Sequence, residues 1–408
     1  MINQKYKTVV EDRSDLLTLL TEACELEHGL ACSYLYSAFS LKQELSEGGM
    51  DWQQLHLVRK WAAQIYLVAS QEMFHLSQAW NLLSAIGGSP YYLRPNFPQN
   101  NKYYPISVSL ALQPFSETSL KRFMMYELPQ DMAEDNVVYL QKSFESIPFD
   151  YKTVGGLYKM IADGIDMLSK KESALFIGDE KLQLGQEEID FPEIIKVTNN
   201  ETAQEAIRRI MEQGEGLSNL HENCHYAIFG DMLNEFQLEK QKLGFEPVRN
   251  CIQNPSVYPR GDQQSEESLP ITDSFSLEVA DLFDDTYNLM LRCLQFIFGS
   301  VSIDVVDKKR LAKFSIGMMP MIIKPLGDIL MQLPAGIEYP GKTAGPAFTM
   351  SRHVVLPDSF DVAMVLISEC FNGLDKRCES LSEDVSNFAL SAVSQNFKRL
   401  NSYLYENN

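Results

Sequence analysis

The hexapeptide Gln71-Glu72-Met73-Phe74-His75-Leu76 lies in a run from Asp51 to Ile86 without proline or glycine. The run ends at Gly87-Gly88-Ser89-Pro90, a sequence that stops helices. A helix of about 35 residues is roughly 50 Å long at 1.5 Å per residue, a length typical of helix bundles. Glu72 and His75 are three residues apart, so such a helix projects both from one face, where they can bind one metal ion.

A second pair with the same spacing, Glu222 and His225, lies in a predicted helix from Thr202 to Phe236 that Gly214 and Gly216 interrupt. Two such pairs on two helices, with single glutamates on two other helices, form the carboxylate-bridged dimetal site known in four-helix bundles. The sequence therefore predicts that both pairs project into the centre of one bundle.

The first predicted helix, from Ser14 to Leu41, supplies a single glutamate, Glu27. Carboxylate and imidazole together suit iron or manganese, with zinc as an option. The alternative is that the acids form a solvated face and that the two histidines are hydrogen-bonded core residues. Glu25 and His28 make a third match, which we interpret as coincidental. Spacing alone leaves both interpretations open.

Glu215 is a further acid, between Gly214 and Gly216. On a continuous helix it lies seven residues before Glu222, on the same face but about 10 Å away along the axis. Two metal ions in such sites are only about 4 Å apart, so both acids reach them only if the helix breaks at the glycines. The alternative is that the glycines end one helix and Glu215 caps the next.

Length and charge limit the class of protein. A chain of 408 residues predicts two or three domains. With 35 basic and 55 acidic residues the net charge is −20, which excludes wrapping a nucleic-acid backbone and disfavours acidic membrane surfaces. No apolar run reaches the roughly 18 residues that span a bilayer.

The pattern predicts an all-α protein of two units. We expect a four-helix bundle at 1–243 with an irregular insertion near 90–116, a proline-rich linker at 244–272 and a C-terminal helical domain at 273–408. The helices expected in the second unit are Leu277–Ile297, Lys308–Met331, Phe360–Leu381 and Val385–Tyr405.

The N-terminus and the cysteines indicate the cell compartment. Residues 1–11 contain no apolar segment typical of a signal peptide. The seven cysteines are an odd number, widely spaced and without a Cys-x-x-Cys pair, which favours reduced thiols. We therefore expect a cytoplasmic protein; the sequence leaves its oligomeric state open, and a homo-oligomer is one option.

Several motifs resemble one known family, the ferritin-like proteins of the iminophenylpyruvate dimer synthase-like type. Relatives of this domain act in bisindole pathways such as those of violacein and staurosporine-type alkaloids. The motifs are spread over nearly the whole chain: Glu25-Leu26-Glu27-His28, Gln71-Glu72-Met73-Phe74-His75-Leu76, Asn81-Leu82-Leu83-Ser84-Ala85-Ile86-Gly87-Gly88, Leu175-Phe176-Ile177-Gly178-Asp179, Glu212-Gln213-Gly214-Glu215-Gly216, His225-Tyr226, Pro325-Leu326-Gly327, Leu333-Pro334-Ala335-Gly336 and Thr343-Ala344-Gly345-Pro346.

The resemblance implies a ferritin-like four-helix bundle and the coupling or oxidation of imines derived from aromatic amino acids. Such a substrate is the expected partner, and two iron ions, with manganese as an option, are the expected cofactor. Glu72 and Glu215 are predicted to be catalytic as well as ligating. The full predicted ligand set is Glu27, Glu72, His75, Glu215, Glu222 and His225, in which Glu222 comes from the spacing alone.

One departure from the family lies at Gly156. The family has Thr-(Val/Ile)-Gly-Glu-Leu-Tyr on the third helix, whereas this chain has Thr153-Val154-Gly155-Gly156-Leu157-Tyr158. Glycine offers no ligand, so we expect water, Glu215 or Asp163 to compensate, or one metal position to be lost.

Three functions follow from these observations. The first is a dimetal oxidoreductase or oxidative coupling enzyme of secondary metabolism. The second is a metal-independent enzyme that dimerises imines through proximity, which Gly156 favours. The third is a non-catalytic ferritin-like protein whose second helical unit serves binding or assembly. Convergence of the predicted ligands in space separates the first function from the third.

Overall fold

The structure is a computed structural model that describes most of the chain. The described residues are 7–99, 109–130, 132, 149, 151–171, 174–189, 191, 193–214, 223–258, 267–350, 352, 354–384 and 388–405. Most of the described residues are helical. The strands β1 (Pro255–Ser256) and β2 (Leu269–Pro270) form a short parallel pair. The predicted all-α class is confirmed. Within the described part, no helix is long and apolar enough to cross a membrane.

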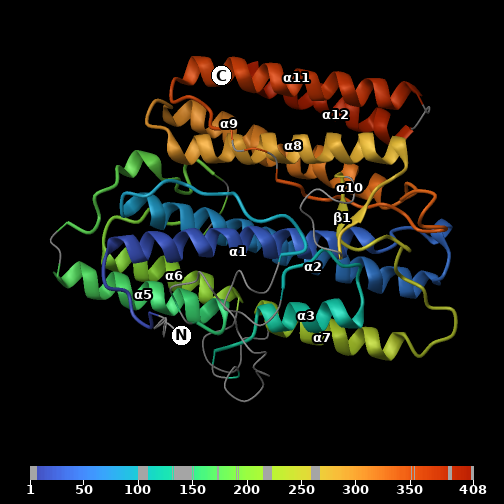
Figure 1. The fold of residues 1–408 in the computed structure, drawn as a ribbon, viewed down its shortest axis with the longest axis horizontal. Helices are drawn as coiled ribbons and strands as arrows, with labels where there is room; N and C mark the ends of the chain where they lie inside the picture. The colour runs from blue at the N-terminus through green and yellow to red at the C-terminus, as the bar shows by residue number, and fades with distance from the viewer. Residues whose placement is uncertain are drawn as a thin grey trace, which may run out of the picture.

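The two long helices expected from the sequence are present as α1 (Arg13–Ser40) and α2 (Trp52–Ala85). They form the middle layer of the molecule (Figure 1). Asp12 caps α1 by accepting a hydrogen bond from the Asp15 amide, and Asp51 caps α2 in the same way with Gln54. The two helices lie side by side across the centre of the molecule, with further helices on both sides (Figure 1). Because α1 is covered on both sides, its buried residues occur all around it and include charged ones.

Beneath this pair lie four shorter helices: α3 (Glu117–Tyr126), α5 (Val154–Lys171), α6 (Asn200–Gly214) and α7 (His225–Glu239). Helix α3 packs on α7, and α5 packs on α6. Figure 1 shows α5 and α3 following one another under α1, with α6 and α7 arranged likewise. The third and fourth helices of the bundle are thus each interrupted midway.

The described parts of the predicted insertion, residues 90–99 and 109–116, contain no helix or strand. They are nevertheless part of the core, since Leu110 and Leu112 are fully buried. Asn254 and Leu112 form two hydrogen bonds with each other, both 2.8 Å long. The backbone N–H of Asn254 donates to the Leu112 carbonyl, and the backbone N–H of Leu112 donates to Oδ1 of the Asn254 side chain.

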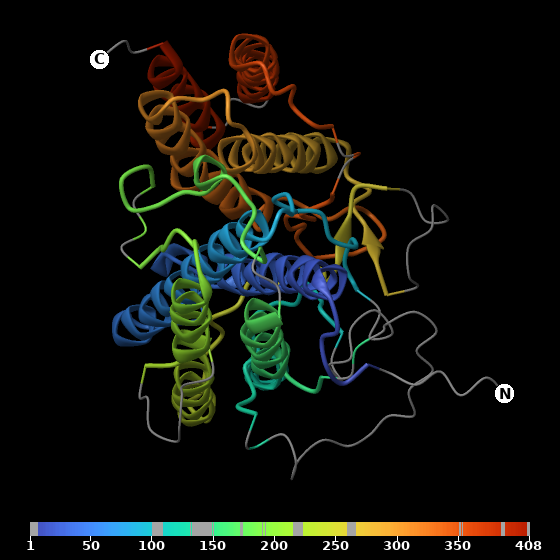
Figure 2. The same ribbon diagram turned by 90° about the vertical axis from the view of Figure 1, so that its left-hand side faces the viewer.

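The C-terminal helices cover the other side of α1 and α2, as Figure 2 shows from a second direction. The predicted helix Lys308–Met331 is divided because a π-helical turn, Met319–Ile323, joins α9 to α10 next to Pro320 and Pro325. The bounds are α8 Ser274–Gly299, α9 Val305–Met318, α10 Lys324–Leu330, α11 Phe360–Asp384 and α12 Phe388–Tyr405.

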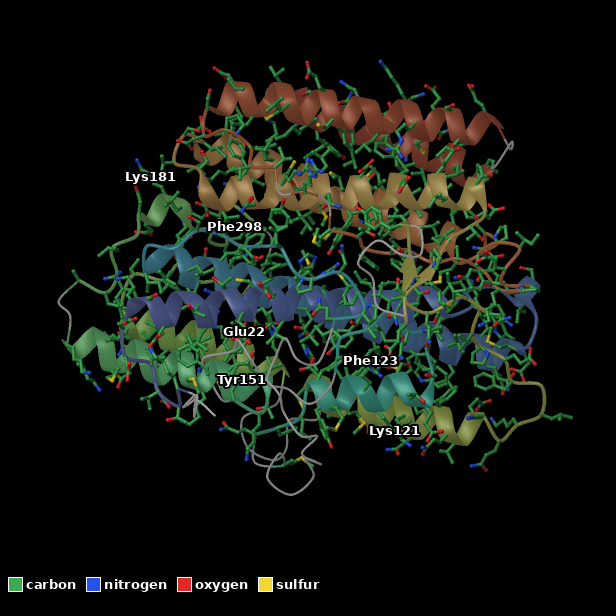
Figure 3. The ribbon with its side chains drawn as sticks, viewed as in Figure 1. Glu22, Lys121, Phe123, Tyr151, Lys181 and Phe298 are labelled. Atoms are coloured by element: carbon green, nitrogen blue, oxygen red, sulfur yellow. The ribbon has the colours of Figure 1, made fainter. Side chains whose placement is uncertain are left out.

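The two halves of the chain share one hydrophobic core. Phe298 of α8 packs edge-on against Trp80 of α2, with ring centroids 4.9 Å apart (Figure 3). Buried His28 of α1 bonds the Tyr287 hydroxyl of α8 through Nε2 at 2.7 Å. The halves are therefore in direct, buried contact.

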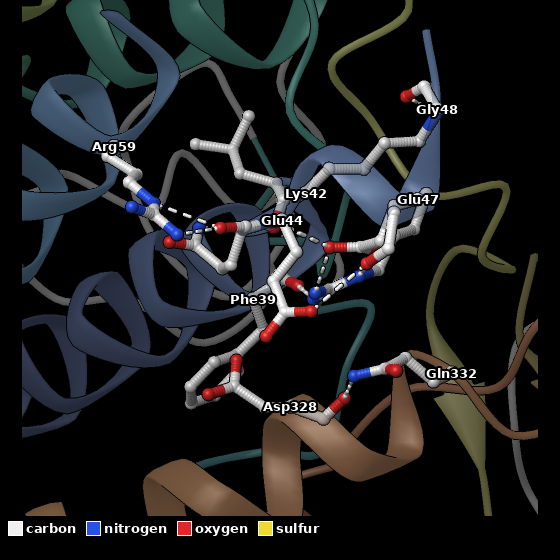
Figure 4. Close-up of polar contacts among 12 residues, drawn as sticks. Phe39, Lys42, Glu44, Glu47, Gly48, Arg59, Asp328 and Gln332 are labelled. Atoms are coloured by element: carbon white, nitrogen blue, oxygen red, sulfur yellow. Dashed lines mark hydrogen bonds and ion pairs between the residues drawn. The ribbon is translucent and has the colours of Figure 1, made fainter. Parts of the chain in front are cut away.

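The proline-rich segment begins as part of this core. The Arg249 guanidinium donates to the Phe39 carbonyl at 2.8 Å and to Glu47 at 2.6 Å, and its amide donates to the Ser40 carbonyl. Figure 4 shows this corner, with Phe39, Glu47 and Asp328 of α10 grouped together. Arg249 thus joins the first part of the segment to α1, and the division of the chain into two domains at 244–272 stays a prediction.

Candidate metal centre

Five buried ionisable side chains meet in the middle of the bundle, where the two lower helices are interrupted. Each is at most 4% exposed, so solvent contributes almost nothing to stabilising their charges. They are Glu27 of α1, Glu72 and His75 of α2, Glu127 directly after α3, and His225 at the start of α7.

These side chains form two trios that share Glu72. In the first trio, His75 Nδ1 lies 3.1 Å from Glu72 Oε2 and 3.5 Å from Glu27 Oε2. In the second, His225 Nδ1 lies 2.9 Å from Glu72 Oε1 and 3.5 Å from Glu127 Oε1. Each oxygen of Glu72 therefore belongs to a different trio, which is the arrangement of a bridging carboxylate.

The local structure explains how each residue reaches the centre. Glu72 and His75 project from one face of α2 because they are three residues apart. Glu127 and His225 stand at helix ends: Glu127 is the C-cap residue of α3, and α7 begins at His225 with Cys224 as its N-cap. The breaks in the lower helices thus bring two of the five groups inward.

Each trio is held by the same kinds of hydrogen bond. The Tyr158 hydroxyl donates to Glu27 Oε1 at 2.6 Å, and the Tyr34 hydroxyl donates to Glu127 Oε1. His75 Nε2 lies 3.1 Å from Gln213 Oε1, and the contact between Nε2 of His225 and the Gln71 amide oxygen has the same length. Each half of the centre therefore contains a glutamate bound by a tyrosine and a histidine bound by a glutamine.

The charges in the cluster depend on one another. Burial lowers the pKa of both histidines, but the surrounding carboxylates outweigh it and raise the pKa of His225 to about 9 and that of His75 well above 6.5. Burial and nearby Glu72 raise the pKa of Glu27 to about 7. Burial and Glu127 also act to raise the pKa of Glu72, yet His225 and His75 hold it below 4.5. Without a metal ion, protons on the histidines therefore offset the buried negative charge.

Two atoms in the second trio lack a hydrogen bond. Glu72 Oε1 and His225 Nδ1 are fully buried and 2.9 Å apart, yet neither makes a hydrogen bond in the structure. Buried polar atoms are rarely left in this state, and a cation held by the carboxylate oxygen and by the imidazole nitrogen, once that nitrogen has lost its proton, would satisfy both. Mixed oxygen and nitrogen donors suit iron, manganese or zinc. The residues present thus fit a metal ion in each trio.

The structure brings together four of the six residues predicted as ligands: Glu27, Glu72, His75 and His225. Glu215 and Glu222 lie in 215–222, outside the described residues. Asn223 and Cys224, the described residues directly before α7, are not helical, so the prediction that Glu222 and His225 project from one helix is wrong.

Glu127 is not among the ligands predicted from the sequence. It follows a helix end directly, where the negative end of the helix dipole disfavours a carboxylate unless a cation is near. The sequence signal that could have identified it is a glutamate at a helix end, followed by Leu128 and Pro129. Glu127 supplies the carboxylate beside His225, the role predicted for Glu222.

Position 156 does not face the centre. Gly156 lies on the half-exposed side of α5, beside Thr153 and Tyr151, whereas Tyr158 on the other side bonds Glu27. Asp163 is mostly exposed and pairs with Lys159 at 3.2 Å, so the expectation that it replaces a missing ligand is wrong. Tyr151, shortly before α5, donates to Glu22 of α1 at 2.6 Å, and Figure 3 labels both residues.

The fold and the cluster together define the class: a four-helix bundle with interrupted third and fourth helices and buried carboxylate–histidine trios at its centre. The chain belongs to the ferritin-like family, whose model matches residues 20–234. A solved ferritin-like protein from Caulobacter vibrioides has a TM-score of 0.51 and 17% identity, covering 83% of this chain and 99% of its own, which supports the fold alone.

Two characterised relatives are similar over most of this chain. Dichlorochromopyrrolate synthase of Lentzea aerocolonigenes is 26% identical over 90% of the chain and 39% of its own length. The 2-imino-3-(indol-3-yl)propanoate dimerase of Chromobacterium violaceum is 25% identical over 92% of the chain and 37% of its own. The chain thus spans less than two fifths of the length of each relative.

Proposed function

We propose that this protein is a dimetal oxidoreductase or oxidative coupling enzyme that acts on an imine derived from an aromatic amino acid. Iron is the proposed metal, with two ions per chain, and manganese is the alternative. The observation that carries the proposal is the pair of buried trios that share Glu72. A carboxylate with one oxygen in each trio is suited to hold two ions close together.

The residues of the cluster have distinct proposed roles. Glu27 and His75 would hold one ion and Glu127 and His225 the other, with one oxygen of Glu72 available to each trio. Tyr158 bonds Oε1 of Glu27 and leaves Oε2, the oxygen that lies near His75, free to bind. Tyr34 instead bonds Oε1 of Glu127, the oxygen that lies near His225, and so orients that carboxylate within the second trio. Bound iron supplies one-electron redox chemistry and a binding place for dioxygen. Burial of the whole cluster keeps bulk water away from this chemistry.

The substrate class rests on the relatives. One is named as a dimerase of an indole-bearing imino acid and the other as a chromopyrrolate synthase. Joining two enamine tautomers of such an imine at carbon forms one carbon–carbon bond and releases two protons and two electrons. Dioxygen is the proposed acceptor of those electrons. Since the chain matches only part of each relative, their activity is not transferred as a whole.

The test uses an imine formed in place from L-tryptophan by an L-amino-acid oxidase. Iron-loaded protein is expected to convert it to a dimer, measured by mass spectrometry, and to consume dioxygen beyond the amount that the oxidase alone consumes, measured with an oxygen electrode. The chelator-treated protein and the Glu72→Ala variant are the controls. Equal dimer formation in all three samples would contradict the metal-dependent proposal.

That same outcome would favour the second candidate, a metal-independent imine dimerase. The observation in its favour is the internal charge balance of the cluster. Glu72 holds the proton on His75 and on His225, so the site is stable without an ion. In this case the protein contributes mainly by holding two imines together.

A further inference from the structure

A chain of three side chains runs from the surface to the first trio. At the surface, the exposed Glu193 accepts a hydrogen bond from Gln213 Nε2 at 2.7 Å through its Oε2 atom. At the inner end, Gln213 Oε1 lies 3.1 Å from His75 Nε2. His75 Nδ1 in turn faces Glu72 and Glu27.

The direction of these hydrogen bonds follows from which atoms can donate. An ionised carboxylate only accepts, so Glu193 selects the amide nitrogen of Gln213. The amide oxygen must then face His75, and an oxygen requires a donor from the ring. Nε2 of His75 therefore carries a hydrogen. A neutral imidazole ring has only one N–H group, so its lone pair is then on Nδ1.

We propose that Gln213, oriented by Glu193, is a positioning residue that makes Nδ1 the metal-binding nitrogen of His75. Gln213 does not touch the metal; it acts through the ring. The inference rests on the proposed metal site. Gln71 occupies the matching position at His225 in the second trio, with its amide oxygen 3.1 Å from Nε2. It provides the comparison within the same molecule.

The first test identifies the nitrogen directly. Protein labelled with ¹⁵N-histidine is loaded with Zn²⁺, which is diamagnetic and accepts the same donors. Histidine resonances are assigned with the His75→Gln and His225→Gln variants. Wild-type His75 is expected to show a zinc-bound Nδ1 and a protonated Nε2. Zinc on Nε2 of His75 would overturn the inference.

The second test measures affinity with Mn²⁺ alone by isothermal titration. Gln213→Leu is expected to weaken binding at one of two positions by about 10- to 100-fold, the range found when partners of metal ligands are removed. The double variant Glu193→Gln with Gln213→Glu reverses the pair but keeps an acceptor for His75, so it should recover most of that loss. Gln71→Leu should affect the other position.

The outcomes separate this inference from the proposed function. If wild-type protein binds neither Zn²⁺ nor Mn²⁺, the proposed function fails and the inference fails with it. If wild type binds two ions and Gln213→Leu binds them equally well with unchanged ring resonances, only the inference fails. Thermal unfolding of each metal-free variant establishes that it is folded.

Discussion

Glu27 and Glu127 are the carboxylates that belong to one trio each. Replacing either with alanine should remove one ion and spare the other, because the other trio keeps all three of its side chains. We expect Glu27→Ala and Glu127→Ala each to retain about one metal ion per chain where wild type holds about two. Metal content measured by mass spectrometry checks this.

The control for that experiment is Asp163→Asn. Asp163 is an exposed acid on α5 that pairs with Lys159 rather than with the centre. Its metal content should equal that of wild type. A loss of metal in Asp163→Asn, or an unchanged content in Glu127→Ala, would contradict the assignment of the second trio.

Metal binding should release protons. In the metal-free protein the pKa of His225 is about 9, because Glu72 and Glu127 outweigh the effect of burial. A metal ion on Nδ1 displaces that proton, so affinity should rise with pH until about 9 and then level off. Calorimetry at neutral pH in buffers of different ionisation enthalpy measures the proton release. Binding without proton release would contradict the protonated state described above.

Among the single elements, sequence periodicity located the long helices, and the two glycines indicated the interruption between α6 and α7. Helices α1 and α2 agree with their predicted bounds because their caps and apolar spacing are local signals. Glu72 and His75 could be paired from spacing alone, since one helix positions both. The placement of Glu127 depends on where α3 ends relative to α2, which is a tertiary relation that no local pattern encodes.

Helix α8 carries a buried acid outside the centre, Asp284. Burial raises its pKa from 3.8 to about 8, while the Thr349 amide donates to Oδ1 at 3.1 Å. The folded state therefore keeps a proton that the unfolded chain loses above about pH 4. This contribution to stability is complete below that pH and is lost as the pH rises through about 8.

We expect Asp284→Asn to remove this pH dependence. Asparagine keeps an oxygen for the Thr349 amide and carries no charge. Between weakly acidic and weakly alkaline pH, the free energy of unfolding of wild type should fall by up to about 1.4 kcal/mol per pH unit relative to the variant. Urea titrations at several pH values measure it. Parallel curves for the two proteins would contradict a buried, titrating Asp284.

At the scale of the whole molecule, the contact between the two halves can be tested at Tyr287. Its hydroxyl contacts His28 Nε2 at 2.7 Å and Cys32 Sγ at 3.2 Å. Tyr287→Phe leaves both buried groups without this partner and should lower the free energy of unfolding by about 1–3 kcal/mol. Tyr258→Phe, at an exposed tyrosine, should change it little. Equal effects would mean that this contact does not stabilise the joined halves.

If Glu72 serves both trios, the iron content of wild type and of Glu72→Ala after expression with iron should differ sharply. We expect about two ions per chain in wild type and almost none in the variant, because both trios lose a shared ligand. Wild-type protein that holds neither iron nor manganese after reconstitution, or a variant that holds as much as wild type, would contradict this role of Glu72.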